Sequence, residues 1–265
     1  DMARSGTFKE DYVRALVSFA SMGLSSTNPE LQATGLLILS QIAINVSLSN
    51  EVITACLNNS LRVENINMTQ LVECILVLLR NNPNYQLPMD TTQMFLQNET
   101  LQLSLQNLAK KTSIFPIAAA LVDAHVTLLM DSDQYIPQLR ILCQGIQEKE
   151  VNNYLEMYLQ HLSQCLNSKT PSSDETNNVE KVLLVLSSEF SGPFDSLLSA
   201  IPANDPLKSV ASRLFYGSSH MLLSSGRTLF LSVDSHEYSV RKEVCSLLKQ
   251  QLEKVNEETR EGDRQ

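Results

Sequence analysis

Apolar residues recur along the first segment at the three- and four-residue intervals of an amphipathic helix. Tyr12, Leu16, Phe19 and Ala20 fall on one face between positions 7 and 24. Thr7 and Glu10, at this segment's start, have the spacing of a capping box. The pattern predicts a helix whose Tyr12–Ala20 face is buried.

A second segment is apolar around most of its circumference. Asn28 and Pro29 have the residue types of a helix N-cap and first helical position. From Leu31 to Val46, apolar side chains then occupy several faces of the predicted helix. A helix of this kind is expected to lie between two neighbours.

The same alternation of short and long helices continues to the end of the chain. Sustained period-two alternation, the mark of half-buried strands, is absent, so the sequence predicts an all-α fold. The further predicted helices span 50–57, 68–79, 90–96, 99–111, 117–130, 135–147, 151–166, 179–190, 194–201, 207–223 and 236–255.

The long apolar helices recur at a roughly constant interval. They begin near Asn28, Asn67, Asn98 and Asp133, at spacings of 39, 31 and 35 residues. Imperfect recurrence in this range is typical of helical solenoids, in which each unit packs against the next.

Three segments carry a family resemblance. Residues 28–43 and 98–109 resemble the third helix of an armadillo repeat, and residues 239–248 resemble the second helix of a HEAT repeat. The resemblance implies a right-handed α-solenoid of armadillo/HEAT-like repeats whose inner surface binds peptides or partner domains.

The resemblance also suggests binding residues. In the best-known armadillo proteins an Asn of the third helix holds the backbone of an extended peptide, because an amide both donates and accepts hydrogen bonds. The matching positions are Gln41, Asn107 and Gln144. Nuclear-import receptors place Trp one turn earlier, and this chain has no Trp, so a receptor of that type is not expected.

The polar segment 168–178 divides the predicted organisation. Residues 1–167 are expected to form armadillo-like repeats, and residues 179–256 are expected to form C-terminal repeats and a cap. The charged segment 257–265 is expected to be a disordered tail.

The predicted linker also contains candidate phosphorylation sites. Thr170 precedes a proline, and Ser172 and Ser173 precede two acidic residues, which fits proline-directed and acid-directed kinases respectively. Phosphorylation there would add negative charge between two helical blocks.

Composition narrows the functional classes. The net charge is −9, so the sequence predicts protein partners with basic segments and no direct nucleic-acid ligand. The 8 glycines never occur as G-x-G, which argues against a dinucleotide-binding fold. No apolar run reaches the length of a membrane span.

The residues that carry catalysis or bind metals form no recognisable motif. The five cysteines lack a C-x-x-C pair, and His161 and Cys165 supply half a metal site at most. We therefore predict no catalytic residue, no metal and no cofactor. Free thiols indicate an intracellular protein, cytoplasmic or nuclear. The first residue, Asp1, suggests a segment of a longer protein.

Three functional interpretations follow. The first is a scaffold or adaptor domain that binds protein partners on a helical-repeat surface. The alternatives are a structural subunit buried in a large intracellular assembly, nuclear assemblies included, and an enzyme without a recognisable motif. The sequence sets no oligomeric state.

Overall fold

The computed structural model describes residues 10–63, 66–168 and 171–216, together with three single residues of the predicted 236–255 helix. All regular secondary structure in these residues is helical, with twelve α-helices, which confirms the all-α prediction. The rest of the 236–255 helix and the predicted 257–265 tail lie outside the described residues.

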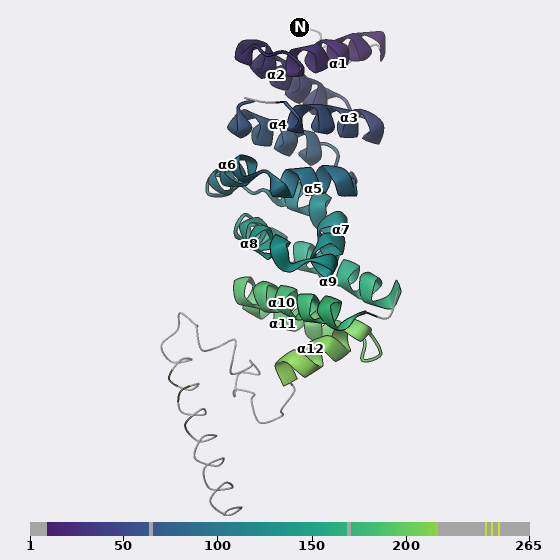
Figure 1. The fold of residues 1–265 in the computed structure, drawn as a ribbon, viewed down its shortest axis with the longest axis vertical. Coiled ribbons are helices and arrows are strands. Elements are labelled where there is room, and N and C mark those ends of the chain that lie inside the picture. The colour runs from purple at the N-terminus through teal and green to yellow at the C-terminus, as the bar shows by residue number, and fades with distance from the viewer. Residues whose placement is uncertain are drawn as a thin grey trace, which may run out of the picture.

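The described helices form two layers that run along the long axis of the molecule (Figure 1). In the even layer each helix contacts the next even-numbered one, and in the odd layer each helix contacts the next odd-numbered one. The even layer consists of α2 (Pro29–Asn45), α4 (Met68–Arg80), α6 (Glu99–Ala109), α8 (Ile136–Gln144) and α10 (Ser173–Glu189). The odd layer consists of α1 (Glu10–Leu24), α3 (Asn50–Leu61), α5 (Met89–Gln97), α7 (Phe115–Asp131) and α9 (Val151–Ser168).

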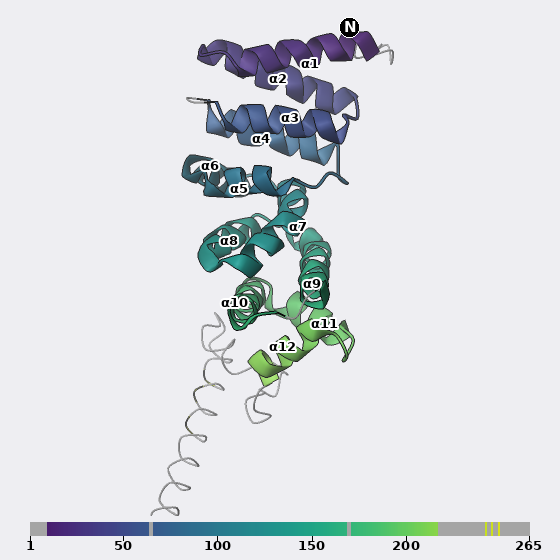
Figure 2. The ribbon, with the colours of Figure 1, turned by 45° about the vertical axis from the view of Figure 1, so that its right-hand side comes forward.

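Two further helices, α11 (Ser191–Ala200) and α12 (Pro206–Tyr216), pack on α9 and α10 at the far end of the stack (Figure 2). Two 3₁₀ turns, η2 (Asp133–Tyr135) and η3 (Glu148–Glu150), precede α8 and α9. Successive helix pairs therefore stack in chain order, so each pair can bury apolar side chains against the pair before it and the pair after it.

The starts of the long even-layer helices are fixed by local hydrogen bonds. Asn28, Asn67 and Asn98 each accept backbone N–H groups with the side-chain oxygen, at 2.9–3.2 Å. These bonds satisfy donors that have no partner within the helix. The predicted N-cap at Asn28 and the predicted helix starts near Asn67 and Asn98 are confirmed.

Helices α1 and α2 approach each other closely through two glycines. A Cβ added to Gly35 would lie 2.8 Å from the carbonyl oxygen of Ala20, and one added to Gly23 would lie 2.7 Å from that of Leu31. Both contacts involve backbone atoms, which cannot move away as the end of a side chain can. Glycine is therefore required sterically at this crossing.

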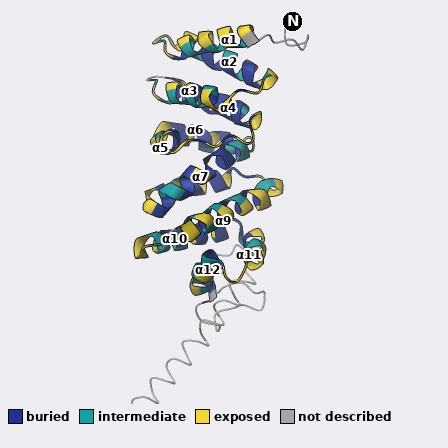
Figure 3. Cartoon of the chain, turned by 90° about the vertical axis from the view of Figure 1, so that its right-hand side faces the viewer, coloured by how far each residue is buried: buried dark blue, intermediate teal, exposed yellow. Residues whose placement is uncertain are grey.

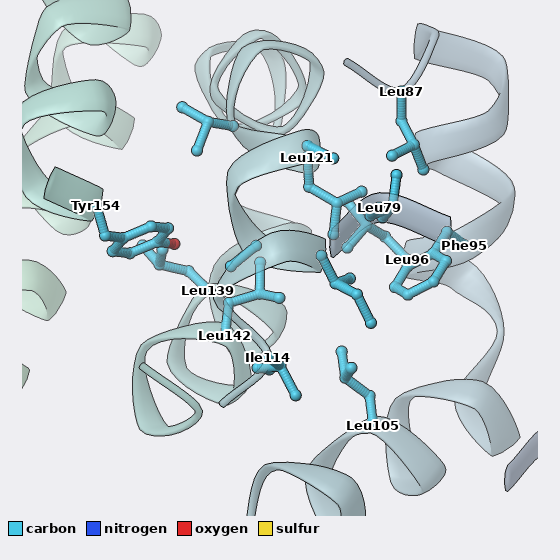
Figure 4. Close-up of a cluster of buried hydrophobic side chains, with 14 of the residues drawn as sticks. Leu79, Leu87, Phe95, Leu96, Leu105, Ile114, Leu121, Leu139, Leu142 and Tyr154 are labelled. Carbon is cyan, nitrogen blue, oxygen red and sulfur yellow. The ribbon is translucent and has the colours of Figure 1, made fainter. Parts of the chain in front are cut away.

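The core is continuous between the two layers (Figure 4). Leu79 of α4, Phe95 of α5, Leu121 of α7 and Leu142 of α8 are all buried in one cluster that extends to Tyr154 of α9. Since these residues come from successive helix pairs, the stack shares one core instead of separate small ones.

The sequence prediction for the buried face of the first helix is wrong in part, and the prediction that the second helix lies between two neighbours is confirmed. Ala20 is buried and Leu16 is half-buried as expected, but Tyr12 and Phe19 are exposed. Helix α2 does lie between α1 and α4, yet Leu37 and Ile44 on its remaining side are exposed. Apolar character in α1 and α2 thus exceeds what their packing in this chain buries.

Most of the described residues of the predicted linker, 168 and 171–178, are helical. Residues 173–178 form the start of α10, because Ser172 and Glu175 make a reciprocal capping box. Asn178 is buried and donates to the carbonyl oxygen of Met130 in α7 at 3.1 Å. The polar side chains of this segment therefore cap and anchor a helix, and its division of the chain into domains stays a prediction.

Candidate interaction surfaces

The three predicted binding residues lie on one layer of the stack. Gln41, Asn107 and Gln144 belong to α2, α6 and α8, and all three side chains are exposed. The even layer therefore carries one exposed amide in each of α2, α6 and α8, and α4 lies between α2 and α6.

The surroundings of these amides differ from one repeat to the next. Leu37 precedes Gln41 by one turn and Leu103 precedes Asn107 by one turn, and both leucines are about 60% exposed. Asn107 accepts a hydrogen bond from Lys110 Nζ at 3.5 Å. Near Gln41 and Asn107 the even layer thus combines exposed amides with exposed aliphatic side chains. That these residues bind a partner stays a prediction.

Exposed apolar side chains concentrate at the first helix pair. Of the nine large apolar residues that are exposed in the described part of the chain, six lie on α1 and α2. They are Tyr12, Phe19, Met22, Leu31, Leu37 and Ile44. An apolar concentration of this kind marks a contact surface more often than a solvent-facing one.

One of these exposed side chains, Met22, also lines a groove between α1 and α3. It has a volume of about 770 Å³ and lies where α1, the α2–α3 loop and α3 meet. Val17, Leu48 and Val52 are among its apolar lining residues, serines are interspersed with them, and its one charged lining residue is Arg14. Sequence reasoning missed this groove because its residues come from three separate segments.

A buried polar chain joins α7 to α9. His125 is fully buried, its Nε2 lies 3.3 Å from the carbonyl oxygen of Tyr135, and Tyr158 Oη lies 3.2 Å from its Nδ1. Because a carbonyl only accepts, Nε2 carries the proton and Nδ1 accepts from the Tyr158 hydroxyl. Burial lowers the pKa of His125 to about 4, so the ring is neutral at pH 7.

Three buried cysteine thiols, those of Cys56, Cys74 and Cys143, are poorly suited to nucleophilic chemistry. Burial raises the pKa of Cys56, raises that of Cys74 to about 11 and raises that of Cys143 well above its ordinary value. A raised pKa reduces the thiolate fraction at neutral pH. These thiols contribute to packing, as their burial indicates.

From the sequence, His161 and Cys165 supply half a metal site at most. His161 Nδ1 lies 3.4 Å from the carboxylate of Asp123 on α7. Within the described residues, no group of three or more His, Cys, Asp or Glu side chains is arranged to hold a metal ion. No described helix combines the length and hydropathy that a membrane span requires.

The candidate phosphorylation sites are only partly described. Thr170 lies outside the described residues, whereas Ser172 is the N-cap of α10 and Ser173 is exposed in its first turn. The Ser172 hydroxyl accepts from the N–H of Glu175 at 3.1 Å. Phosphorylation of these residues stays a prediction.

Comparison with known proteins gives one family. The family model of U3 small nucleolar RNA-associated protein 10 matches residues 12–125, which run from α1 into α7 and make up somewhat less than half of the chain. No curated protein matches the chain. The matched residues include the α1–α3 groove and most of the exposed large apolar side chains of the described chain.

Proposed function

We propose that this chain is a helical-repeat structural subunit of a nucleolar ribonucleoprotein assembly that contains a small nucleolar RNA. The observation that carries the proposal is the match of residues 12–125 to the family of U3 small nucleolar RNA-associated protein 10. The match favours a subunit of an assembly over a peptide-binding adaptor, and it favours a nuclear location.

The finer part of this proposal is an armadillo/HEAT-like α-solenoid with a right-handed superhelix, and the stacking of the helix pairs supports the solenoid. Helix pairs stack in chain order in two layers, and each layer keeps its own succession of contacts. Such stacks present long surfaces on which several partners can bind side by side.

Protein contacts, more than RNA contacts, are proposed to hold the subunit in place. The chain carries a net charge of −9, which on average repels a phosphate backbone. The groove between α1 and α3 is lined mostly by aliphatic and serine side chains, a lining suited to apolar protein anchors. We also propose that the subunit is not an enzyme.

The test is co-sedimentation of the tagged chain with U3 small nucleolar RNA in lysates of its own cells. We expect the chain to migrate in large particles with this RNA and to localise to the nucleolus. Migration as a free protein of about 30 kDa, together with exclusion from the nucleolus, would contradict the proposal.

Two control measurements test separate parts of the proposed function. Binding of a single-stranded RNA oligonucleotide by the isolated chain at physiological salt would contradict the protein-contact part. A chain with Gln41→Ala, Asn107→Ala and Gln144→Ala distinguishes the adaptor interpretation, because a structural subunit is expected to remain in the particle despite these changes.

A further inference from the structure

One candidate phosphorylation site, Ser173, lies where α10 meets α12. These two helices lie side by side at the far end of the stack (Figure 3). A polar cavity of about 490 Å³ lies between them. Its lining consists of Ser173, Asp174, Thr176, Asn177 and Glu180 of α10 with Arg213 of α12. The cavity therefore joins a serine at the start of one helix to a cation on another.

The two adjacent serines at this helix start differ in their hydrogen bonds. The Ser172 hydroxyl accepts from the N–H of Glu175 at 3.1 Å, and the Ser172 N–H donates to the Glu175 carboxylate at 2.7 Å. A phosphate on Ser172 would therefore lie against the carboxylate of its own capping partner, which would repel it. Ser173 is exposed and takes no part in this capping box. The geometry favours Ser173 as the phosphate acceptor.

The start of α10 can open for a kinase without disturbing the core. A kinase reaches a helical serine when the local turn unwinds. Residues 172–174 are exposed, and the first buried residue of α10 is Asn178. Unwinding of the first turn therefore breaks the capping box but exposes no buried apolar side chain. Asp174 and Glu175, which follow Ser173, supply the acidic residues that an acid-directed kinase recognises.

The phosphoryl transfer requires a protein kinase and ATP as co-reactant. The Ser173 hydroxyl attacks the γ-phosphorus, so a bond forms between Ser173 Oγ and phosphorus while the bond to the leaving ADP breaks. The hydroxyl proton passes to the catalytic carboxylate of the kinase and then to solvent. The phosphoserine so formed carries a charge of about −1.5 to −2 at pH 7.

Arg213 is the cation that such a phosphate would meet. Among the described residues that line the cavity, Arg213 alone is basic. Its guanidinium donates to the carboxylate of Glu180, which lies about 10.5 Å along α10 from Ser173. The Arg213 side chain is 63% exposed, so solvent leaves room for it to rotate toward Ser173. A guanidinium has five N–H donors and binds phosphate through two of them at once.

The other charges near Ser173 make the effect of a phosphate depend on Arg213. Three acids on the first part of α10 would repel it, namely Asp174, Glu175 and Glu180. Lys181, the one basic residue of α10, bonds to Asp133 beside α7 at 2.6 Å. Lys169 precedes α10 and lies outside the described residues. Attraction between the phosphate and Arg213 is therefore what would offset the repulsion by the acids.

We propose that Ser173 is phosphorylated by an acid-directed kinase and that its phosphate binds Arg213, which holds α12 against α10. Helix α12 packs on both α9 and α10, so this bond would strengthen the contacts at the far end of the stack. The inference goes beyond the proposed function, because it concerns a part of the chain that follows the family match at residues 12–125.

A double-mutant cycle on the full chain tests the bond to Arg213. Phosphoserine is placed at position 173 by an expanded genetic code, in the wild type and in Arg213→Gln, and thermal midpoints are compared with those of the unmodified proteins. We expect phosphoserine to change the midpoint by about 2–4 °C more favourably in the wild type than in Arg213→Gln. The difference should shrink in about 1 M salt. Phosphoserine at the exposed Ser188, near the other end of α10, is the control and should show no dependence on Arg213.

Mass spectrometry of the protein from its own cells, isolated with phosphatase inhibitors, tests whether the modification occurs. We expect phosphate on Ser173. Absence of phosphate from Ser173, or phosphate on Thr170 or Ser172 alone, would overturn the inference. Equal midpoint changes in the wild type and in Arg213→Gln would also overturn it. None of these results bears on the proposed function, because none depends on association with U3 small nucleolar RNA.

Discussion

Burial of His125 makes the stability of the stack depend on pH between about 6.5 and 4. The ring has no contact with solvent, and burial lowers its pKa to about 4 from an ordinary value of 6.5. The unfolded chain therefore binds a proton in this range that the folded chain does not bind. The contribution of the neutral ring to the free energy of unfolding is therefore fully present above pH 6.5 and is lost as the pH falls toward 4.

The size of the effect follows from the two pKa values. The full difference corresponds to about 3 kcal/mol, of which about 2 kcal/mol is lost by pH 5. The matched control is His125→Gln, since a glutamine amide can donate to the Tyr135 carbonyl oxygen and accept from the Tyr158 hydroxyl, yet does not titrate. Carboxylates that also titrate in acid, such as Asp133, are present in both proteins and cancel in the comparison.

The assay is urea denaturation at pH 7.5 and pH 5.0, followed by far-ultraviolet circular dichroism and by tyrosine fluorescence, which no Trp obscures. Between pH 7.5 and pH 5.0 the free energy of unfolding of the wild type should fall by about 2 kcal/mol more than that of His125→Gln. Coincidence of the two signals checks that unfolding is cooperative. Equal losses in the two proteins would refute the assignment of a neutral buried ring.

Three further predictions concern stability and use the same denaturation assay. Gly35→Ala should destabilise the protein by about 2 kcal/mol or more, because the new Cβ meets the α1 backbone. The control Gly192→Ala, at a position with open space around it, should be neutral or stabilising. Equal effects of the two substitutions would contradict the requirement for glycine where α1 and α2 cross. Phe95→Ala should cost about 3–5 kcal/mol because the ring is fully buried, while Leu103→Ala on the surface should cost less than about 0.5 kcal/mol. Ser172→Ala should cost about 1 kcal/mol by removing the cap of α10, and an unchanged midpoint would show that the capping box contributes little.

The features that the sequence predicted correctly depend on local interactions. Asn28, Asn67 and Asn98 cap helices by bonding to backbone groups two or three residues away, so their role can be inferred without knowing the fold. The exposure of Asn107 likewise follows from helical periodicity, because the buried Leu101, Leu105 and Leu108 of α6 define the opposite face. Whether such an exposed amide binds a partner depends on chemistry that the chain alone does not contain.

The buried side of α1 was harder to predict because tertiary packing decides it. Tyr12, Leu16, Phe19 and Ala20 do lie within one arc of the helix. The crossing of α2 at Gly35 buries the Ala20 edge of that arc and leaves the Tyr12–Phe19 edge exposed. A glycine contact between two helices has no signature in the hydrophobic pattern of either one.

The segment 168–178 shows a different kind of error. Its composition of Ser, Thr, Asp and Asn is that of a loop. The spacing of Ser172 and Glu175 is that of a capping box, which predicts a helix start at this point. Only the contact of Asn178 with the Met130 carbonyl oxygen, 48 residues away in sequence, required the fold itself.

The end of the family match does not coincide with an end in the structure. His125 is the last matched residue, yet it lies inside α7, which continues to Asp131, and it bonds to Tyr158 beyond the match. Helix α7 also packs against α9 and α10, so the core extends through this point without a break. A structural role proposed for residues 12–125 must therefore include the helices that follow, because the matched part is stabilised by packing against them. The pH experiment on His125 tests this coupling directly, since its hydrogen-bond partner belongs to the unmatched part of the stack.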